Sequence, residues 1–366
     1  KEIYNKGVVT LTADAKWVLT ADIEITKLNL AGHSLSISTA QGVEKKTLKI
    51  TGTDSALIEV GTNTNGVLLQ LNGVNLELKQ TAATSKDNAI NAADSKFYLD
   101  ADNAAISVAN ASGKSMIQTG KAQEGKGTIF DLNKSSMTLS SNAGVQCAYF
   151  KLVDSDFTRE SADGKTATSS VAGYFDISGK STFTADAVSV YAMALSGEST
   201  FTADNYYGYT GNSTDVGNFW GSTTNLEMKK IVVGEGASLT LTNDINKNSE
   251  SGFGTLFSVK NNGTATITGG KLDYFLNNGE VTVSGGSIGT VYNYADATVT
   301  GGQISKIENA GRIVDNTEAG IAQTITGVAV LTDGVIKQNI TINQNATLII
   351  PEGMDVTFNG GKITND

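Results

Sequence analysis

The stretch GGKLDYFLNNGEVTVSGGSIGTVYNYADATVTGGQISKIENAGRIVDN, residues 269–316, repeats a Gly-Gly pair every 16 residues. A fixed period of this size is typical of repeat architectures and decides the fold before any single element is assigned. Apolar and polar residues alternate within each repeat, which indicates half-buried strands because successive strand side chains point to opposite faces. The stretch therefore predicts short strands separated by turns, once per repeat.

The repeats form apolar columns when each is placed under its predecessor, which begins at Phe253. The main columns are Leu256, Leu272, Ile288 and Ile304; Val259, Phe275, Val291 and Ile307; Ala265, Val281, Ala297 and Ile313; and Ile267, Val283 and Val299, with Asp315 in the last row. Columns of this kind arise when each row lies directly above the last. We predict an all-β, single-stranded parallel β-helix (β-solenoid), right-handed because parallel crossovers are almost always so. Its rungs should have 16–18 residues in the C-terminal half and be more irregular upstream.

Asparagine and glycine recur at fixed places in the repeat. Four asparagines precede a column of small residues; they are Asn261, Asn277, Asn293 and Asn309. Asparagine tolerates the left-handed backbone of a tight corner, and stacked amides can hydrogen-bond along a column. We predict a structural amide ladder at these four positions, with the Gly-Gly pairs marking a second corner.

The periodicity loosens upstream but continues. GKSTFTAD at 179–186 returns as GESTFTAD at 197–204. We expect one elongated domain over residues 1–366, since solenoid stability adds rung by rung. Residues 1–35 should form an N-terminal cap and the first strands, with Trp17 shielding the open sheet edge, and residues 36–366 the stacked rungs.

Composition limits the functional classes. The formal net charge of −10 excludes the basic surface that nucleic-acid binding requires, and no apolar run is long enough to span a membrane. We expect a monomer, with the single cysteine, Cys147, as a buried apolar residue. The chain begins KEIYNKG, which we interpret as a form whose leader has been removed, hence an extracytoplasmic protein.

Both ends of the chain carry motifs of a known class. VTLTADAKWVLTADIEITKLNLAGHSLSI (9–37) and ATLIIPEGMDVTFNGGKITND (346–366) resemble the first and last rungs of secreted bacterial right-handed β-helices of the pectin-lyase-like superfamily. The resemblance covers the whole chain in style, and it is greatest to adhesin-like surface proteins. It implies a right-handed coil that is secreted or held at the bacterial cell surface, and its motifs specify fold and not chemistry.

The catalytic motifs of that superfamily are missing from this sequence. Polygalacturonase-like members carry Asn-Thr-Asp, Asp-Asp, Gly-His-Gly and Arg-Ile-Lys motifs, none of which occurs here. The single histidine, His33, sits beside an expected corner, where a turn role is favoured over a general base. Arg159 and Arg312, the two arginines, are far apart, and Arg312 shares a column with acidic residues. No catalytic residue is therefore assigned.

A calcium site is the one cofactor that the sequence suggests. DADN at 100–103 supplies Asp100 and Asp102, and Asp186 recurs 18 residues later as Asp204. Carboxylates one rung apart repel each other unless a cation or water separates them. Exposed Ala-Asp corners with no metal are the favoured interpretation of these four residues, and otherwise we expect no cofactor.

An aromatic segment is the candidate ligand site. Residues 205–225 set five aromatic residues among Gly, Asn, Ser and Thr without strand alternation, namely Tyr206, Tyr207, Tyr209, Phe219 and Trp220. We interpret the segment as a loop excursion whose rings bind sugars or proteins; the alternative is that they fold back over the solenoid. Tyr149, Tyr174 and Tyr191 are expected to form part of its wall.

These features together predict a non-catalytic surface or secreted protein of adhesin-like or glycan-binding type. Its partner would be a polysaccharide, or a host glycan or protein. Two alternatives stay open: a diverged polysaccharide lyase or glycoside hydrolase, and a purely structural surface spacer.

Overall fold

The computed structural model describes residues 7–53, 56–81, 89–92, 96–110, 117–118, 127–141, 145–159, 170–208, 230–241, 258–269 and 271–365. The described residues form strands, turns and bends and contain no helix, so no helix among them could span a membrane. The chain divides into two compact units, the first made of residues 1–192 and 209–228 and the second of residues 193–208 and 229–366. Each is described by itself.

The first unit is built from three rows of parallel strands. The first row contains β2 (Ala15–Leu19), β5 (Leu35–Thr39), β8 (Val67–Asn72), β11 (Lys96–Asp102), β14 (Gly127–Asn133), β16 (Gln146–Val153) and β18 (Ser170–Ser178). The second contains β3 (Ile23–Ile25), β6 (Lys46–Gly52), β9 (Val74–Gln80), β12 (Ala105–Asn110), β15 (Ser136–Ser141), β17 (Asp156–Arg159) and the start of β19 (Thr182–Leu195). The third contains β1 (Val8–Thr10), β4 (Lys27–Asn29), β7 (Ile58–Glu59), β10 (Ile90–Asn91) and β13 (Ile117–Gln118).

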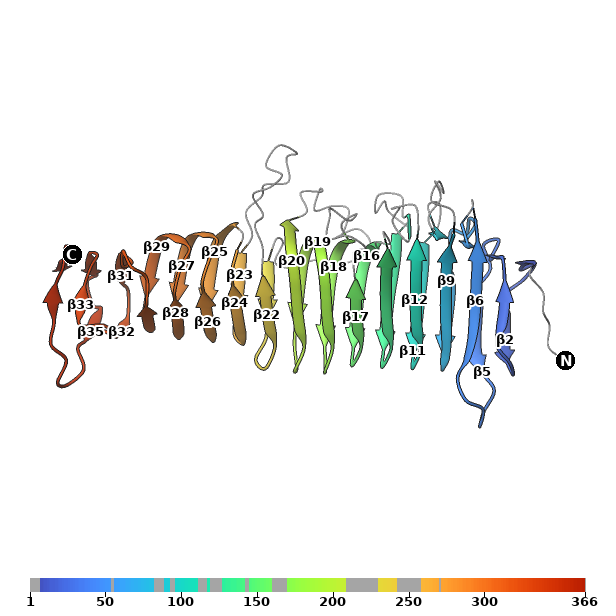
Figure 1. Ribbon diagram of the computed structural model, residues 1–366, viewed down its shortest axis with the longest axis horizontal. Coiled ribbons are helices and arrows are strands. Elements are labelled where there is room, and N and C mark those ends of the chain that lie inside the picture. Colours follow the sequence, from blue (N-terminus) through green and yellow to red (C-terminus); the bar gives the residue numbers. More distant parts are fainter. Residues whose placement is uncertain are drawn as a thin grey trace. The chain divides into compact units, whose positions relative to one another are not determined.

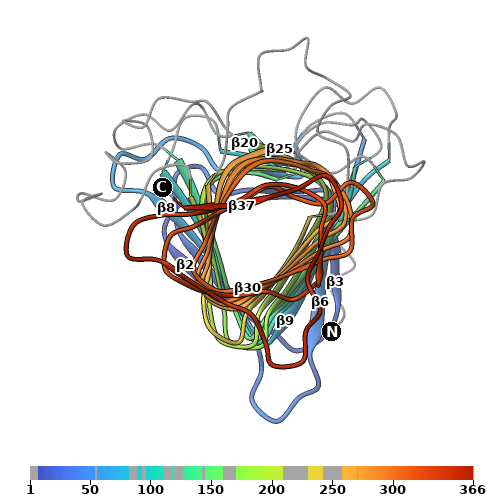
Figure 2. The same ribbon diagram turned by 90° about the vertical axis from the view of Figure 1, so that its left-hand side faces the viewer.

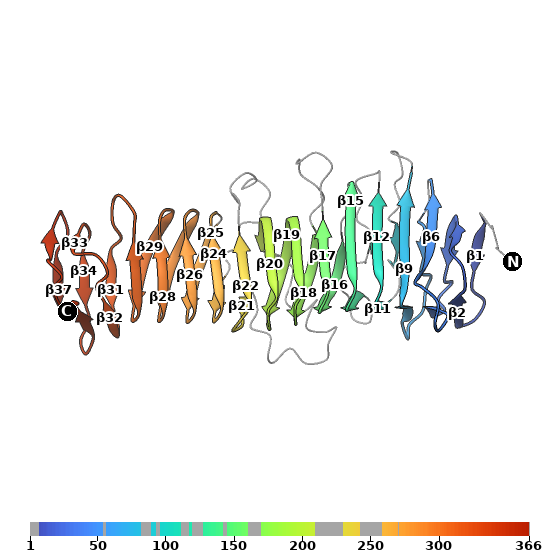
Figure 3. The same cartoon turned by 60° about the horizontal axis from the view of Figure 1, so that its bottom comes forward.

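Each row stacks one strand of every rung on the next, as in a parallel β-solenoid. In Figure 3, β6, β9, β12, β15 and β17 follow one another in this order. Figure 2 looks along the stack and places β2 and β8 of the first row on one side, with β3 and β6 of the second row on the other. The predicted all-β fold with stacked parallel strands is therefore confirmed.

Aromatic side chains fill the interior of the first unit. Phe130, Phe150 and Phe175 occupy one register position on β14, β16 and β18, and neighbouring ring centroids lie 5.4 and 5.5 Å apart. Phe157 and Phe183 stack in the second row at 4.5 Å. All five rings are at most 1% exposed. Buried aromatic pairs of this kind add about 0.5–1.5 kcal/mol each beyond their area burial.

The corner between the first and second rows has a left-handed backbone in every rung from β8 onward. The residue that follows each first-row strand has a positive φ, at Gly73, Asn103, Lys134, Asp154 and Gly179. Buried serines then hold the corners together, because the Ser135 amide donates to Ser155 Oγ and the Ser155 amide to Ser181 Oγ. Repeated corners keep the strands in register although rung lengths differ.

The second unit stacks in the same way. Its strands are the end of β19, β20 (Thr200–Gly208), β21 (Lys230–Val233), β22 (Ser238–Leu241), β23 (Ser258–Asn261), β24 (Thr264–Ile267), β25 (Lys271–Asn277), β26 (Glu280–Val283), β27 (Ser287–Asn293), β28 (Asp296–Val299), β29 (Gln303–Asn309), β30 (Arg312–Asp315), β31 (Gln323–Ile325), β32 (Val328–Val330), β33 (Val335–Ile336), β34 (Ile340–Ile342), β35 (Thr347–Ile349), β36 (Thr357–Phe358) and β37 (Ile363–Asn365). Figure 1 shows β25, β27 and β29 in sequence along this stack.

The register confirms the apolar columns expected from the sequence. Leu272 pairs with Ile288 and Ile288 with Ile304, and the other three columns align in the same way. Leu256 lies outside the described residues. Column members point inward because strand side chains alternate between faces, and most are less than 5% exposed.

The four asparagines form a continuous chain of amide hydrogen bonds inside the second unit. The Nδ2 groups of Asn261, Asn277 and Asn293 each donate to the Oδ1 of the next asparagine, at 2.8, 2.8 and 2.9 Å. Asn309 ends the chain by donating to Gln323 Oε1 at 3.1 Å. All four asparagines are at most 1% exposed. Their conformation is that of strand residues and not left-handed, so this hydrogen bonding, and not the corner backbone, explains their recurrence.

The repeated glycines have two separate reasons. The second glycine of a pair has a positive φ, 80° at Gly286 and 84° at Gly302, which L side chains rarely adopt. The first is pressed against the previous rung, since a Cβ on Gly301 would lie 2.5 Å from the Ser284 carbonyl oxygen. Gly279, beyond the asparagine column, is likewise required by close approach to the backbone of the preceding rung.

Two expected boundaries differ from the structure. Stacking begins before residue 36, because β1 pairs with β4 and Trp17 lies on β2, which pairs in register with β5. The rung length of 16 holds around the asparagine column, but 27 residues separate Thr268 from Leu241 and 23 separate Thr364 from Thr341, which lie on adjacent rungs. The extra residues lie in connections between strands, where they leave the pairing unchanged.

We expect Asn277→Ala to lower the free energy of unfolding by about 1–3 kcal/mol, because it leaves buried amide groups of Asn261 and Asn293 unpaired. The matched control is Asn278→Ala, whose amide makes an exposed bond to Asn262. Chemical denaturation followed by circular dichroism measures both. Equal stabilities of the two variants would contradict a stabilising role for the buried column.

Candidate ligand-binding groove

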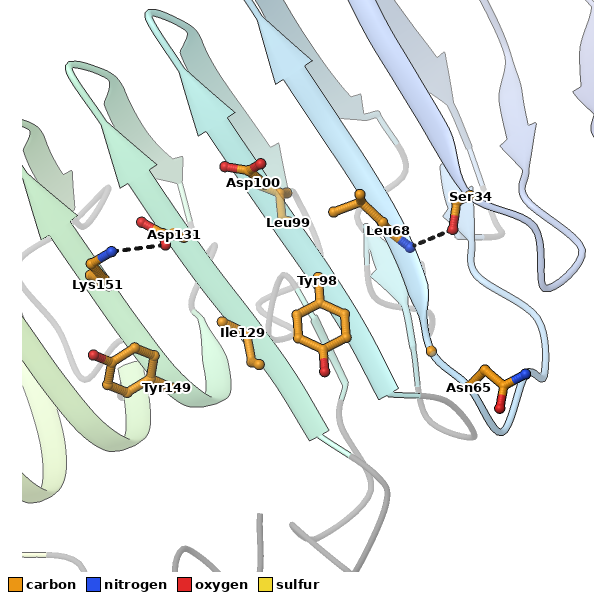
Figure 4. Close-up of a pocket in the computed structure, with 11 residues that line it drawn as sticks. Ser34, Asn65, Leu68, Tyr98, Leu99, Asp100, Ile129, Asp131, Tyr149 and Lys151 are labelled. Atoms are coloured by element: carbon orange, nitrogen blue, oxygen red, sulfur yellow. Dashed lines mark hydrogen bonds and ion pairs between the residues drawn. The ribbon is translucent and has the colours of Figure 1, made fainter. Parts of the chain in front are cut away.

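The largest cavity described in the first unit is an open groove on the outer face of its first row. It has a volume of about 750 Å³ and crosses β8, β11, β14 and β16. Figure 4 shows the lining side chains pointing away from the strands, and they are Ser34, Asn65, Leu68, Tyr98, Leu99, Asp100, Ile129, Asp131, Tyr149 and Lys151, together with Gly66. A groove of this size suits a small-molecule or oligosaccharide ligand.

One row of the groove is aromatic and apolar. Leu68, Tyr98, Ile129, Tyr149 and Tyr174 occupy the same register position on successive strands. The rings of Tyr149 and Tyr174 stack, with centroids 5.3 Å apart and planes inclined by 10°. The spacing between rungs is about 4.8 Å, so the row offers ring faces and apolar edges at regular intervals.

The second row is polar and lies two positions further along each strand. It consists of Ser36, Gln70, Asp100, Asp131, Lys151 and Asp176. Neighbours hydrogen-bond along the row: Ser36 donates to Gln70 at 3.0 Å, and Gln70 to Asp100 at 3.0 Å. The Lys151 ammonium is 3.0 Å from Asp131 Oδ2, in the ion pair drawn in Figure 4.

The two rows are connected at Tyr149, whose hydroxyl donates to Asp176 Oδ2 at 3.1 Å. Burial raises the pKa of the Tyr149 phenol, and the carboxylate of Asp176 raises it further. Burial and the same carboxylate also raise the pKa of Tyr174. Both phenols are therefore neutral hydrogen-bonding groups at physiological pH.

This arrangement combines the two elements of sugar recognition. Flat, half-buried tyrosine rings can pack against the apolar face of a pyranose ring. Carboxylate, amide and ammonium groups beside them can bond its hydroxyls, and charged groups form the stronger bonds. Because the groups are already ordered by bonds along the row, little side-chain entropy remains to be lost on binding.

The predicted aromatic site cannot be placed in this groove. Tyr206 and Tyr207 lie on β20, so the strand continues to Gly208, beyond the expected start of the excursion at 205. The side chains of both, and the whole of Tyr209, Phe219 and Trp220, lie outside the described residues. The binding role of these five residues stays a prediction.

The predicted metal residues are only partly described. Asp102 accepts a hydrogen bond of 2.8 Å from Asn133, and Asp100 faces the groove. The side chains of Asp186 on β19 and Asp204 on β20 lie outside the described residues. Within the part of the chain that the structure describes, no three His, Cys, Asp or Glu side chains cluster as metal ligands would.

The remaining candidate residues are apart from the groove. His33 follows the turn formed by Ala31 and Gly32, with its Nδ1 3.7 Å from the carboxylate of Asp14. Arg159 is buried at the end of β17, in register with Leu139, and Arg312 lies 3.8 Å from Asp296 on the exposed face of the second unit.

Cys147 is buried on β16, as expected from the sequence. Burial raises the pKa of its thiol well above the ordinary value. The protonated thiol that results is a poor nucleophile.

Sequence reasoning missed the groove although its signal is present. A recurring triplet places an outward apolar or aromatic residue, an inward apolar residue and an outward charge in succession: Tyr98-Leu99-Asp100, Ile129-Phe130-Asp131, Tyr149-Phe150-Lys151 and Tyr174-Phe175-Asp176. The spacing varies from 20 residues between Asp131 and Lys151 to 30 between Gln70 and Asp100, so no fixed period reveals it.

Comparison with known proteins assigns no family. No family model matches the chain, and comparison with curated proteins and with solved structures finds no match either.

The raised phenol pKa values predict a specific loss of stability at alkaline pH. In the unfolded chain a tyrosine ionises near pH 10, whereas the folded protein keeps Tyr149 protonated to higher pH. The stabilisation is complete below about pH 10 and is lost as pH rises further, because ionisation then favours the unfolded chain. We expect Tyr149→Phe to reduce the fall in melting temperature between pH 8 and pH 11, and Tyr174→Phe to act in the same direction. An unchanged pH dependence in both variants would contradict this environment.

Proposed function

We propose that this protein is a non-catalytic glycan-binding protein of adhesin-like type. The groove on β8, β11, β14 and β16 of the first unit is its main binding surface. The observation that carries the proposal is the pairing of a tyrosine row with a polar row along one outer face, over a groove of about 750 Å³. An oligosaccharide lying along the groove would meet equivalent contacts rung after rung.

A right-handed coil of the pectin-lyase-like type, and a place outside the cytoplasm, belong to the same proposal. Support comes from the resemblance of residues 9–37 and 346–366 to secreted bacterial β-helices, and from the parallel stacking of the strands. The aromatic residues of 205–225 are proposed as a second sugar contact. A structural spacer would need none of these outward aromatic rows.

Binding is favoured over cleavage by the chemistry of the groove. A β-elimination needs a base to remove the proton next to a uronate carboxylate and a cation to stabilise the charge that develops. Lys151 is the one basic side chain lining the groove among the described residues, and it is ion-paired to Asp131. An ammonium held by a carboxylate keeps its proton and is poorly suited to act as that base.

A glycan array with neutral, amino-bearing and acidic oligosaccharides tests the proposal. We expect micromolar to millimolar binding of at least one class, weakened about tenfold or more by Tyr98→Ala and by Tyr149→Ala. The matched control is Tyr274→Ala, which removes an exposed tyrosine from a strand of the second unit. Melting temperatures establish that each variant is folded.

Three outcomes of that experiment would count against the proposal. An array without binding would leave the spacer as the better account. Equal weakening by all three substitutions would remove the groove as the site. Release of unsaturated uronates, seen as an absorbance rise, would show cleavage.

A further inference from the structure

The charge of the groove specifies the class of glycan more closely. On the outer face formed by β8, β11, β14, β16 and β18, the described charged side chains are four carboxylates and two ammonium groups: Asp100, Asp102, Asp131, Asp176, Lys96 and Lys151. The face therefore carries an excess of negative charge at neutral pH. A polyanionic ligand would be repelled from it, and a cationic one attracted.

Two of these carboxylates have their charge uncompensated by any described cation. Asp100 accepts a hydrogen bond from the neutral amide of Gln70, and Asp176 from the neutral hydroxyl of Tyr149. Lys151 is paired with Asp131, and Lys96 lies over the ring of Tyr98, 5.3 Å from its centroid. A carboxylate held by a neutral donor keeps lone pairs and full charge for a ligand.

The position of these carboxylates matches that of a ring substituent. Asp100 and Asp176 lie beside the tyrosine row, two residues along the strand from Tyr98 and Tyr174. A pyranose ring stacked on a tyrosine would place its equatorial substituents over the polar row. An ammonium substituent there would form a charge-assisted hydrogen bond, whereas a uronate would face a like charge.

We propose, building on the proposed function, that the groove selects glycans with protonated amino groups, such as glucosamine oligomers, over uronic-acid glycans. N-acetylated oligomers of the same linkage should bind more weakly, because acetylation removes the charge and leaves the ring face unchanged. The preference is electrostatic, so it should shrink as salt screens the exposed carboxylates.

Isothermal titration calorimetry with three probes tests this selection: a glucosamine tetramer, the N-acetylglucosamine tetramer of the same linkage, and a galacturonate tetramer. At low salt we expect the glucosamine tetramer to bind about tenfold more tightly than its acetylated counterpart, as two partly exposed ion pairs would give. The galacturonate tetramer should bind least. Raising salt to about 0.5 M should bring the first two affinities within about threefold.

Asp100→Asn is the informative variant. It should reduce the preference for the glucosamine tetramer about threefold while leaving affinity for the acetylated tetramer unchanged, since the hydrogen bond from Gln70 can be kept. Asp296→Asn, which removes the same charge from an exposed strand of the second unit, should leave the preference unaltered.

The outcomes separate the inference from the function on which it rests. Equal affinity for the two amino-sugar tetramers, or tighter binding of galacturonate, would overturn the charge selection while glycan binding stands. Binding of a neutral glycan alone on the array would overturn the charge selection in the same way. If no glycan binds anywhere, the proposed function fails, and the selection with it.

Discussion

Parallel hydrogen bonding between the backbones of successive rungs is the constraint on which each unit depends. A strand of one rung pairs residue for residue with a strand of the next, so a side chain is stacked on its counterparts above and below. Inward positions become columns that must be filled, and outward positions become rows on the surface. One rule therefore gives both the core and the candidate binding face.

The columns show how polar residues can be used inside such a stack. In the second unit, Asn261 to Asn309 pass one amide hydrogen bond from rung to rung and are fully buried without unpaired groups between them. In the first unit, Ser135 and Ser155 connect successive corners in a comparable way with hydroxyl groups. Phenylalanines take the comparable positions where the interior is wide enough for rings.

The C-terminal columns could be predicted because 16-residue rungs let period and register coincide there. The groove could not, since the connections between Tyr98, Ile129 and Tyr149 differ in length and only backbone pairing aligns these residues. The corner residues Lys134 and Asp154 were hidden for another reason. They adopt the left-handed conformation without being glycine, so composition gives no sign of the turn.

The central claim is that stacking converts residues of irregular spacing into one continuous binding row. A crystal structure of the protein with a bound glucosamine tetramer tests it most directly. The account predicts pyranose rings against Tyr98 and Tyr149, with amino groups within hydrogen-bond distance of Asp100 or Asp176. Sugar density elsewhere on the molecule, or strands in which Tyr98, Ile129 and Tyr149 are out of register, would contradict it.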